Sequence, residues 1–189
     1  VFEQPDLKAT FTFTVTAPES WTVVSNQPAH SVDAGVWVFE PTPIISSYIT
    51  AIIAGPYVDW RDSLQSSDGR TIPLGVFARK SLSDHVDADY LFEKTKQGFE
   101  YYEDKFGVPY PFDKYDQLFV PEFNAGAMEN PGCVTFRDPL IFTSRVTRGV
   151  QIQRATTIAH EMAHQWFGNI VTPKWWDDLW LNESFAEYM

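Results

Sequence analysis

The sequence predicts an α+β fold in which strands come first and helices follow. Short runs of alternating polar and apolar side chains occur up to about residue 80, and helical spacing of apolar residues replaces them beyond it. With 189 residues, of which 44% are hydrophobic and 16% aromatic, the chain is large enough to form packed cores. We therefore expect two domains, over residues 1–80 and 81–189.

The strand signals of the first domain are alternating runs at residues 10–16, 36–39 and 48–53. Segments rich in proline, serine and glycine separate the runs, as at residues 41–43 and 66–69. Antiparallel sheets with one face on a core and one face in solvent give this alternation. The first domain is therefore predicted to be an antiparallel β domain, either a sandwich or an open sheet.

The second domain is expected to open with an amphipathic helix. From Ser83 onward, apolar side chains recur at spacings of three and four, and Gly107 followed by Pro109 ends the run. Short strands are expected at residues 117–120 and 134–137. The second domain should therefore mix helices with strands.

Two further helices are predicted near the end of the chain. The first covers residues 148–167, and Gly168 is its expected stop. The second runs from Asn182 to Met189, because Asn182 is a good N-cap and acidic residues follow it near the positive end of the helix dipole. The aromatic segment 175–180 is expected to pack and fix this last helix rather than to contact substrate.

The apolar stripe of the helix over residues 148–167 would consist of Ile152, Ala155, Ala159, Met162 and Trp166.

The most specific chemical feature is the H-E-x-x-H motif of residues 160–164. Residues four apart on a helix share a face, so the imidazoles of His160 and His164 can reach one ion. Zn²⁺ held by two histidines and a carboxylate keeps a fourth position for water, and Glu161 beside it can accept that water's proton. The motif therefore indicates a hydrolytic zinc site with one ion per chain, although the motif alone also occurs by chance.

Two glutamates compete for the place of third ligand. Glu183 follows the second histidine by nineteen residues, and Glu187 lies four further on, on the same helix face. Glu183 is preferred because it lies in the first turn, whereas Glu187 could be a solvated acid or one that supports a ligand. Asp177 and Asp178 could orient an imidazole N–H, or could simply lie at the surface.

Composition narrows the kind of metal site and the partners. Structural zinc sites are usually closed by four cysteines or histidines, and the chain has only Cys133, His30 and His85 outside the motif. A net charge of -11 argues against binding of nucleic acid or anionic membranes and is compatible with amine-bearing partners. A lone cysteine needs no oxidising compartment, which favours a cytoplasmic location. No apolar run approaches the roughly 18 residues of a membrane span, and the oligomeric state is left open.

A second constellation lies upstream at residues 121–130. The small residues Ala125, Gly126 and Ala127 would let another chain approach the backbone, as when an extended peptide is held by main-chain hydrogen bonds. Glu129 adds a carboxylate that could receive the protonated amine of a peptide terminus. Without further context, the residues alone favour an acidic loop.

Taken together, Gly126-Ala127-Met128-Glu129-Asn130, the H-E-x-x-H motif and Glu183 resemble the aminopeptidase N family of zinc metallopeptidases, the gluzincin aminopeptidases. The two motifs occur in the family's order and at a compatible distance. Similar flanking segments extend the resemblance over nearly the whole chain, at residues 2–11, 106–111, 171–178 and 180–186.

The resemblance implies a fold, an activity and a set of roles. The fold would be the later part of a β-sandwich-like N-terminal domain, followed by the first part of a thermolysin-like catalytic domain. The activity would be release of N-terminal amino acids from peptides with a free amine. His160, His164 and Glu183 would bind zinc, Glu161 would be the general base, Glu129 would bind the α-amine, and Gly126, Ala127, Met128 and Asn130 would form the rest of the substrate-binding motif.

Two family positions have no counterpart here. By the resemblance, the tyrosine that stabilises the oxyanion would lie downstream of Met189, and an acidic or amide residue that helps to bind the amine would lie before Val1. We therefore expect a fragment of a longer protein, with impaired activity in isolation. The alternatives are a zinc-binding piece without catalysis, or a relative of the epoxide hydrolase type, which has Gly-Gly-Met-Glu-Asn where this chain has Gly126-Ala127-Met128-Glu129-Asn130.

Overall fold

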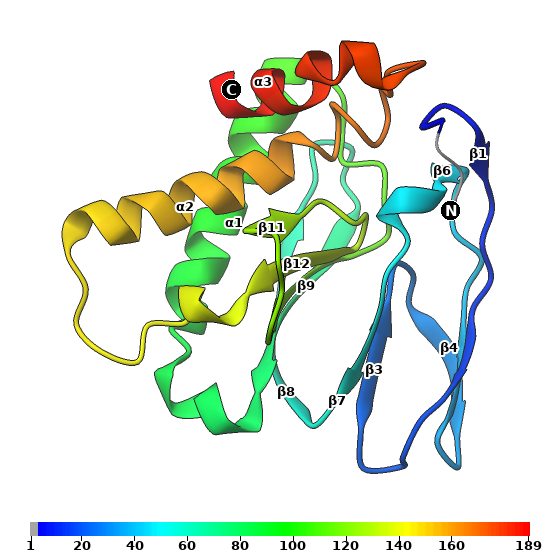
Figure 1. Cartoon of the computed structure of the whole chain (residues 1–189), viewed down its shortest axis with the longest axis vertical. Coiled ribbons are helices and arrows are strands. Elements are labelled where there is room, and N and C mark those ends of the chain that lie inside the picture. The colour runs from blue at the N-terminus through cyan, green and yellow to red at the C-terminus, as the bar shows by residue number, and fades with distance from the viewer. Residues whose placement is uncertain (1–3) are drawn as a thin grey trace.

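The computed structural model describes residues 4–189 and has the predicted α+β fold. Residues 1–3 lie outside the described residues. They include the start of the expected first domain and the start of the stretch 2–11 that resembles the family. Figure 1 shows strands of the first part of the chain on one side and the helices on the other, with a central sheet between them. Of the described helices, none has the length and apolar character needed to cross a membrane.

The first part of the chain is antiparallel, as predicted, but its strands are short. Three separate small sheets are formed, and every strand pair within them is antiparallel. The pairs are β1 (Lys8–Ala9) with β6 (Ile45–Ser46), β3 (Thr22–Ser25) with β7 (Ile52–Gly55), and a sheet in the order β2 (Thr14–Thr16), β5 (Val36–Phe39) and β4 (Ala29–Asp33).

Two of the predicted strands are only partly correct. In the run 10–16 only β2 is a strand, and the preceding residues bond irregularly, with Thr42 N donating to Phe11 O at 2.8 Å. In the run 48–53, Tyr48 belongs to a 3₁₀ turn, η1 (Ser47–Ile49), and the strand begins at residue 52. The turn forms because the backbone N–H and the hydroxyl of Thr50 both donate to Ser47 O, which ends the extended conformation.

A five-stranded mixed sheet forms the centre of the molecule. The central strand β10 is parallel to both neighbours, and the two outer pairs are antiparallel. β8 and β9 precede residue 80 yet pair in this sheet, so hydrogen bonds cross the expected domain boundary, which stays a prediction. The order is β11 (Ala127–Met128), β12 (Cys133–Arg137), β10 (Tyr115–Val120), β9 (Thr71–Arg79) and β8 (Tyr57–Gln65).

The first long helix, α1 (Ala88–Phe106), ends where the sequence predicts. Gly107 follows it with φ of 65°, the left-handed conformation that favours glycine, and its N–H donates to Glu103 O. α1 connects the parallel strands β9 and β10, as a crossover helix must. Short 3₁₀ turns accompany the helices: η2 (Lys80–His85), η3 (Asp138–Leu140) and η4 (Trp176–Asp178).

The second long helix, α2 (Arg148–Ala163), is shorter than predicted. It begins at the N-cap Thr147, whose side chain accepts a hydrogen bond from Val150 N. It ends four residues before the predicted end because the chain tightens: Gln165 N donates to Met162 O, and Trp166 N to Ala163 O.

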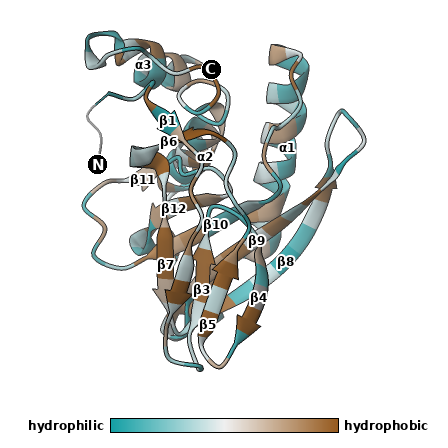
Figure 2. Ribbon diagram, turned by 90° about the vertical axis from the view of Figure 1, so that its right-hand side faces the viewer, coloured by the Kyte–Doolittle hydropathy of each residue, from teal (hydrophilic) through white to brown (hydrophobic). Residues whose placement is uncertain are grey.

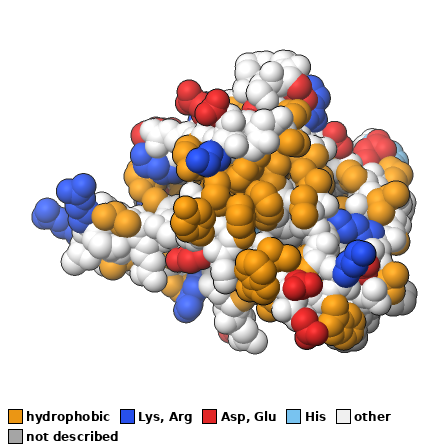
Figure 3. All heavy atoms as spheres, turned by 90° about the horizontal axis from the view of Figure 1, so that it is seen from above, with side chains coloured by type: hydrophobic (Ala, Val, Ile, Leu, Met, Phe, Trp, Pro, Cys, Tyr) orange, Lys and Arg blue, Asp and Glu red, His pale blue; other side chains and the backbone are white. Residues whose placement is uncertain are grey.

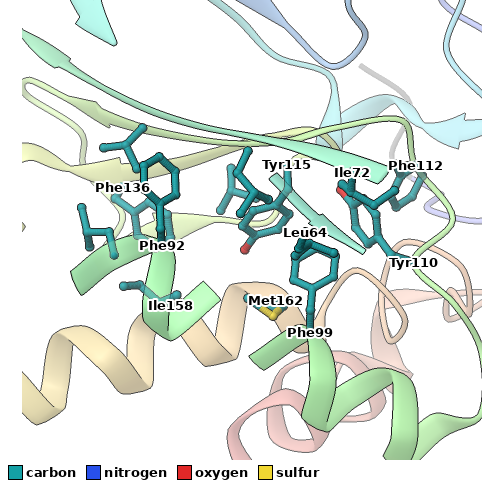
Figure 4. Packing of buried hydrophobic residues seen from close by; sticks show 14 of the residues in the cluster. Leu64, Ile72, Phe92, Phe99, Tyr110, Phe112, Tyr115, Phe136, Ile158 and Met162 are labelled. Atoms are coloured by element: carbon teal, nitrogen blue, oxygen red, sulfur yellow. The ribbon is translucent and has the colours of Figure 1, made fainter. Parts of the chain in front are cut away.

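The apolar stripe predicted for α2 is also wrong at its first position. Ile152 exposes 54% of its surface, and residues 147–153 are all exposed. Ile158 occupies the core in its place, close to Met162 and Phe92 in Figure 4. The core is rich in aromatic contacts, with the ring centroids of Phe99 and Tyr115 5.2 Å apart. Figure 2 shows, in brown, the hydrophobic residues that the strands contribute.

Three polar contacts fix α2 in the molecule. Tyr102 Oη donates to Ala159 O at 3.0 Å, which ties α1 to α2. Trp166 Nε1 donates to Val108 O at 2.9 Å. The buried Arg154 guanidinium donates to both carboxylate oxygens of Asp87, at 2.9 and 2.6 Å. These contacts hold α2, which carries His160 and is followed directly by His164.

The last helix, α3 (Trp180–Tyr188), begins before Asn182, so the prediction of Asn182 as its N-cap is wrong. In the aromatic segment before it, the packing role holds for Trp176, which is partly buried. Trp175 and Trp180 expose 46% and 59% of their surfaces, so they do not pack as predicted. Figure 3 shows apolar side chains gathered on the face seen from above, and the exposed apolar residues of α3 and its approach are Trp175, Leu179, Trp180, Leu181 and Tyr188.

Candidate metal centre

The structure brings His160, His164 and Glu183 together. The two Nε2 atoms are 3.0 Å apart, and Glu183 Oε2 lies 3.4 Å from that of His160 and 3.5 Å from that of His164. His164 follows the last residue of α2 but keeps helical dihedral angles, φ -60° and ψ -22°, so the spacing of four residues still places both rings on one face. Glu183 comes from the first turn of α3, which contacts α2 in Figure 1.

The donor atoms fit a tetrahedral divalent cation. Zinc bonds to nitrogen and oxygen of about 2.0 to 2.2 Å require roughly 3.3 to 3.6 Å between ligands in a tetrahedron. The separations of 3.4 and 3.5 Å lie in this range, and the third, 3.0 Å between the two nitrogens, is slightly shorter. Two unprotonated nitrogens facing each other at 3.0 Å would repel unless a proton or a cation lay between them. The residues present therefore fit zinc.

The orientation of His164 comes from a residue that the sequence reasoning missed as a partner. Its Nδ1 lies 2.6 Å from Asn182 Oδ1 and 3.0 Å from Phe167 O, so Nδ1 donates and Nε2 keeps its lone pair. Asp177 and Asp178, the predicted candidates, are exposed. An asparagine at the start of a helix reads as an N-cap, so the local sequence carried no signal of this contact.

The geometry also separates the two candidate glutamates. Glu183 Oε2 faces both Nε2 atoms, whereas Glu187 Oε2 lies 3.3 Å from Nδ1 of His160. This buried Nδ1 has no other partner at ion-pair or hydrogen-bond distance among the described residues. Glu183 thus lies close to both Nε2 atoms, whereas Glu187 lies within ion-pair distance of the outer nitrogen of His160 without forming a hydrogen bond to it.

The charges of the centre support one another. Burial acts to lower the pKa of His164, but the hydrogen bond to Glu183 and the charge of Glu129 raise it to about 9. The pKa of His160 is also raised, chiefly by its hydrogen bond to Glu183. Those two hydrogen bonds hold the pKa of Glu183 well below its ordinary value. The site therefore favours positive charge beside Glu183, whether protons or a metal ion supply it.

Glu161 is buried beside the ligand triangle. It exposes 6% of its surface, and burial, followed by the charge of Glu129, raises its pKa to about 8. A carboxylate that titrates near neutral pH suits proton transfer. One oxygen each of Glu161 and Glu129 and one ring nitrogen of His164 lie within 4.8 Å of one another. Since His164 has only Nε2 free, this second group could not hold a metal at the same time as the first.

A cleft of about 540 Å³ joins these groups to the upstream motif. Glu129 lies at its wall and exposes only 5% of its surface, so the acidic-loop alternative does not describe it. Its backbone oxygen accepts hydrogen bonds from Gln165 Nε2 at 3.1 Å and Asn169 Nδ2 at 2.9 Å, two residues that the sequence did not indicate. The cleft is lined by Ala125, Gly126, Ala127, Met128, Glu129, Gln153, Thr156, Thr157, His160, Glu161, His164, Glu183 and Glu187.

The small residues of the motif lie at a sheet edge. β11 pairs with β12 on one side only, with Ala127 opposite Phe136 and Met128 opposite Thr135. A Cβ added at Gly126 would meet no atom within 4 Å, so the chain's own packing does not require glycine there. Asn130 lies elsewhere: its side chain donates to Thr135 Oγ1 at 3.3 Å and does not line the cleft. Of the five residues expected to bind substrate, four therefore face the cleft.

Comparison with known protein families agrees with this arrangement. The profile of the Peptidase family M1 domain matches residues 90–189, which include the cleft, the histidines and Glu183. The profile of the Peptidase M1 N-terminal domain matches residues 1–49. The chain belongs to peptidase family M1. The two matches leave residues 50–89 between them, and this segment includes β7, β8 and β9.

Several relatives within the family match almost the whole chain. The chain is 61% identical to aminopeptidase N of Streptomyces lividans over 187 residues, which cover 99% of this chain and 22% of that protein. It is 39% identical to aminopeptidase Ey of Gallus gallus, over all of this chain and 20% of that protein. It is 38% identical to the tricorn protease-interacting factor F2 of Thermoplasma acidophilum, over 99% of this chain and 23% of that protein. The chain thus spans about a fifth of the length of these relatives.

Proposed function

We propose that this chain carries the zinc centre and the amine anchor of an aminopeptidase, which releases N-terminal amino acids from peptides. The observation that carries the proposal is the closeness of two groups with different tasks. A carboxylate oxygen of the buried Glu129 lies within 4.8 Å of one of Glu161, in the same cleft as the metal-fitting triangle. The names of the Streptomyces and chicken relatives agree with this function.

His160, His164 and Glu183 would hold one zinc ion. Their donor atoms form a triangle of tetrahedral size, and Asn182 and Glu187 lie against the outer nitrogens of the two imidazoles. When bound, zinc supplies a Lewis acid for a carbonyl oxygen and makes a coordinated water more acidic.

Glu161 would move the protons of the reaction. Its carboxylate would accept a proton from the attacking water and deliver it to the amine that leaves. Burial favours this role because it brings the pKa of the carboxylate to about 8, where uptake and release are both accessible. Glu161 would therefore be the general base and then the general acid.

Glu129 would restrict cleavage to the first peptide bond. An ammonium group on the Glu129 carboxylate would form a charge-assisted hydrogen bond in a buried setting. The amine nitrogen and the carbonyl carbon of one residue are about 2.5 Å apart, and each further residue adds about 3.8 Å. The short separation between Glu129 and Glu161 therefore fits one residue between the anchor and the reacting carbonyl.

The edge strand β11 would hold the peptide backbone. Ala127 and Met128 have their unpaired side at the sheet edge, where an extended peptide can add as a further strand. The open space beside Gly126 would leave room for that peptide. The small residues of the motif would then be needed for binding the peptide and not for packing of the fold.

The test compares three forms of the protein at its natural length. Glu161→Gln should retain one zinc per chain and lose turnover of an aminoacyl chromogenic amide by at least 10²-fold. Glu129→Gln should mainly raise KM for the free-amine substrate. The unaltered protein should cleave the free amide and leave its N-acetylated form intact. Equal cleavage of the two would refute the anchor, and zinc without any turnover would favour a non-catalytic zinc-binding protein.

The cytoplasmic location expected from the single cysteine stays a prediction.

A further inference from the structure

Tyr48 connects the first part of the chain to the catalytic cleft. It lies in η1, within the segment matched by the M1 N-terminal domain profile, yet its hydroxyl is 3.4 Å from Glu129 Oε1. Its ring stands edge-on to Trp176, with the centroids 5.7 Å apart. A residue distant in sequence therefore makes a polar contact with the proposed amine anchor.

Tyr48 contacts Glu129 from outside the catalytic cleft. It does not line the cleft that holds the metal-fitting residues. It lines a neighbouring cavity of about 520 Å³ together with Met128, Asn130 and Tyr57. A substrate in the cleft would thus meet the Glu129 carboxylate, and Tyr48 would act on the substrate only through that carboxylate.

The hydrogen bonds around Tyr48 run in one direction. His164 Nδ1 donates to Asn182 Oδ1. The contact with Asn182 acts to lower the pKa of the Tyr48 hydroxyl, as a donor does, which assigns the donation to the Asn182 amide N–H. With its oxygen accepting from Asn182, the Tyr48 hydroxyl is left to donate its proton to Glu129 Oε1.

The hydroxyl keeps that proton. Burial, followed by the charge of Glu129, raises the pKa of Tyr48 well above its ordinary value. The phenol therefore stays neutral and remains a donor at any pH at which a peptide amine is protonated.

We infer that Tyr48 is a positioning residue: its hydroxyl fixes the Glu129 carboxylate for the substrate amine and joins it, through Asn182, to the metal-fitting imidazole of His164. The inference rests on the proposed function, because it assigns Tyr48 to the recognition step of that reaction. It also gives the N-terminal part of the fold a role in substrate recognition, since Tyr48 is supplied from that side.

The test is Tyr48→Phe in the zinc-loaded protein at its natural length. The phenyl ring keeps the contact with Trp176, and the contacts of the hydroxyl with Glu129 and Asn182 are lost. We expect KM for an aminoacyl amide to rise roughly tenfold, with kcat changed by less than about threefold. Tyr57→Phe, in the same cavity but without contact to Glu129, is the matched control and should leave both constants unchanged.

A binding measurement separates positioning from a merely structural role. Tyr48→Phe should weaken an amino-acid hydroxamate roughly tenfold and leave acetohydroxamate, which has no amine, unchanged. In a Glu129→Gln background, Tyr48→Phe should have no further effect on KM. Equal weakening of both hydroxamates, an unchanged KM, or loss of zinc and of folding in Tyr48→Phe would each overturn the inference.

The failure of the proposed function would look different. If the unaltered protein does not distinguish free from acetylated amines, the amine anchor itself is wrong. If it does distinguish them and Tyr48→Phe behaves like the unaltered protein, only the role of Tyr48 is wrong.

Discussion

Asn182 Oδ1 lies 2.6 Å from His164 Nδ1, so the residue that precedes the proposed third ligand on α3 also contacts the ring of His164, directly after α2. One short segment would thus supply both a carboxylate for the proposed metal and an acceptor that orients an imidazole. The relative position of the two helices is therefore part of the metal centre. It follows that residues without a metal contact should control zinc affinity.

Asn182→Ala should weaken zinc binding by roughly 10- to 100-fold, because His164 Nδ1 loses the nearer of its two acceptors and keeps only Phe167 O. The dissociation constant can be measured by competition with a chromogenic chelator. Ser184→Ala, an exposed position on the same helix, is the matched control and should bind zinc like the unaltered protein. Similar affinities for all three proteins would refute the orienting role of Asn182.

Gly168→Ala should reduce both stability and zinc affinity. Gly168 has φ of 125°, and a Cβ there would overlap Asn182 Oδ1, the acceptor of the His164 bond. We expect a loss of about 3 kcal/mol or more in the free energy of unfolding, measured by urea denaturation. Gly107→Ala separates strain from overlap, because Gly107 has φ of 65° and its Cβ would meet no atom within 4 Å. It should cost about 1 kcal/mol and leave zinc affinity intact.

Zinc binding should become tighter as the pH rises from 6 to 9. The imidazole of His164 has a pKa raised to about 9 and that of His160 is raised as well, so protons occupy the nitrogens that the metal needs. Binding at pH 7 should release between one and two protons, which calorimetry in buffers of different ionisation enthalpy detects. An affinity independent of pH over this range would contradict the assignment of these nitrogens.

Cys133 should be inert in the folded protein. Its thiol is fully buried, and burial raises its pKa to about 12, so almost no thiolate is present at pH 8. A thiol reagent should label one site per chain after denaturation and none before. Ser184→Cys, at an exposed position, should label at once in the folded protein. The folded state retains this proton above pH 9, so the contribution of the thiol to stability falls as the pH rises from about 9 towards 12.

Features fixed by local chemistry were predictable from the sequence. The strand at residues 36–39 follows from alternation, and the end of α1 follows from a glycine that adopts the left-handed conformation. The grouping of His160 with His164 follows from helix geometry, and Glu183 was favoured for its place in the first turn of the next helix.

Features that depend on contacts between distant segments were not predictable. Tyr48 and Glu129 are 81 positions apart, and Asn169 and Glu129 are 40 apart. The exposure of Ile152 depends on where α2 leaves the core, which its own apolar spacing does not encode. The prediction of Asn182 as an N-cap was wrong for a different reason. The residue type that caps helices is also a good acceptor for an imidazole N–H.

The central claim is that the metal centre and Glu129 together select the first residue of a peptide. The most direct measurement is mass spectrometry of the products that the zinc-loaded protein, at its natural length, forms over time from one unblocked peptide of about ten residues. The account predicts free amino acids and a series of peptides shortened one residue at a time from the amino end, with none from the N-acetylated peptide. Internal fragments, or equal processing of the acetylated peptide, would contradict it.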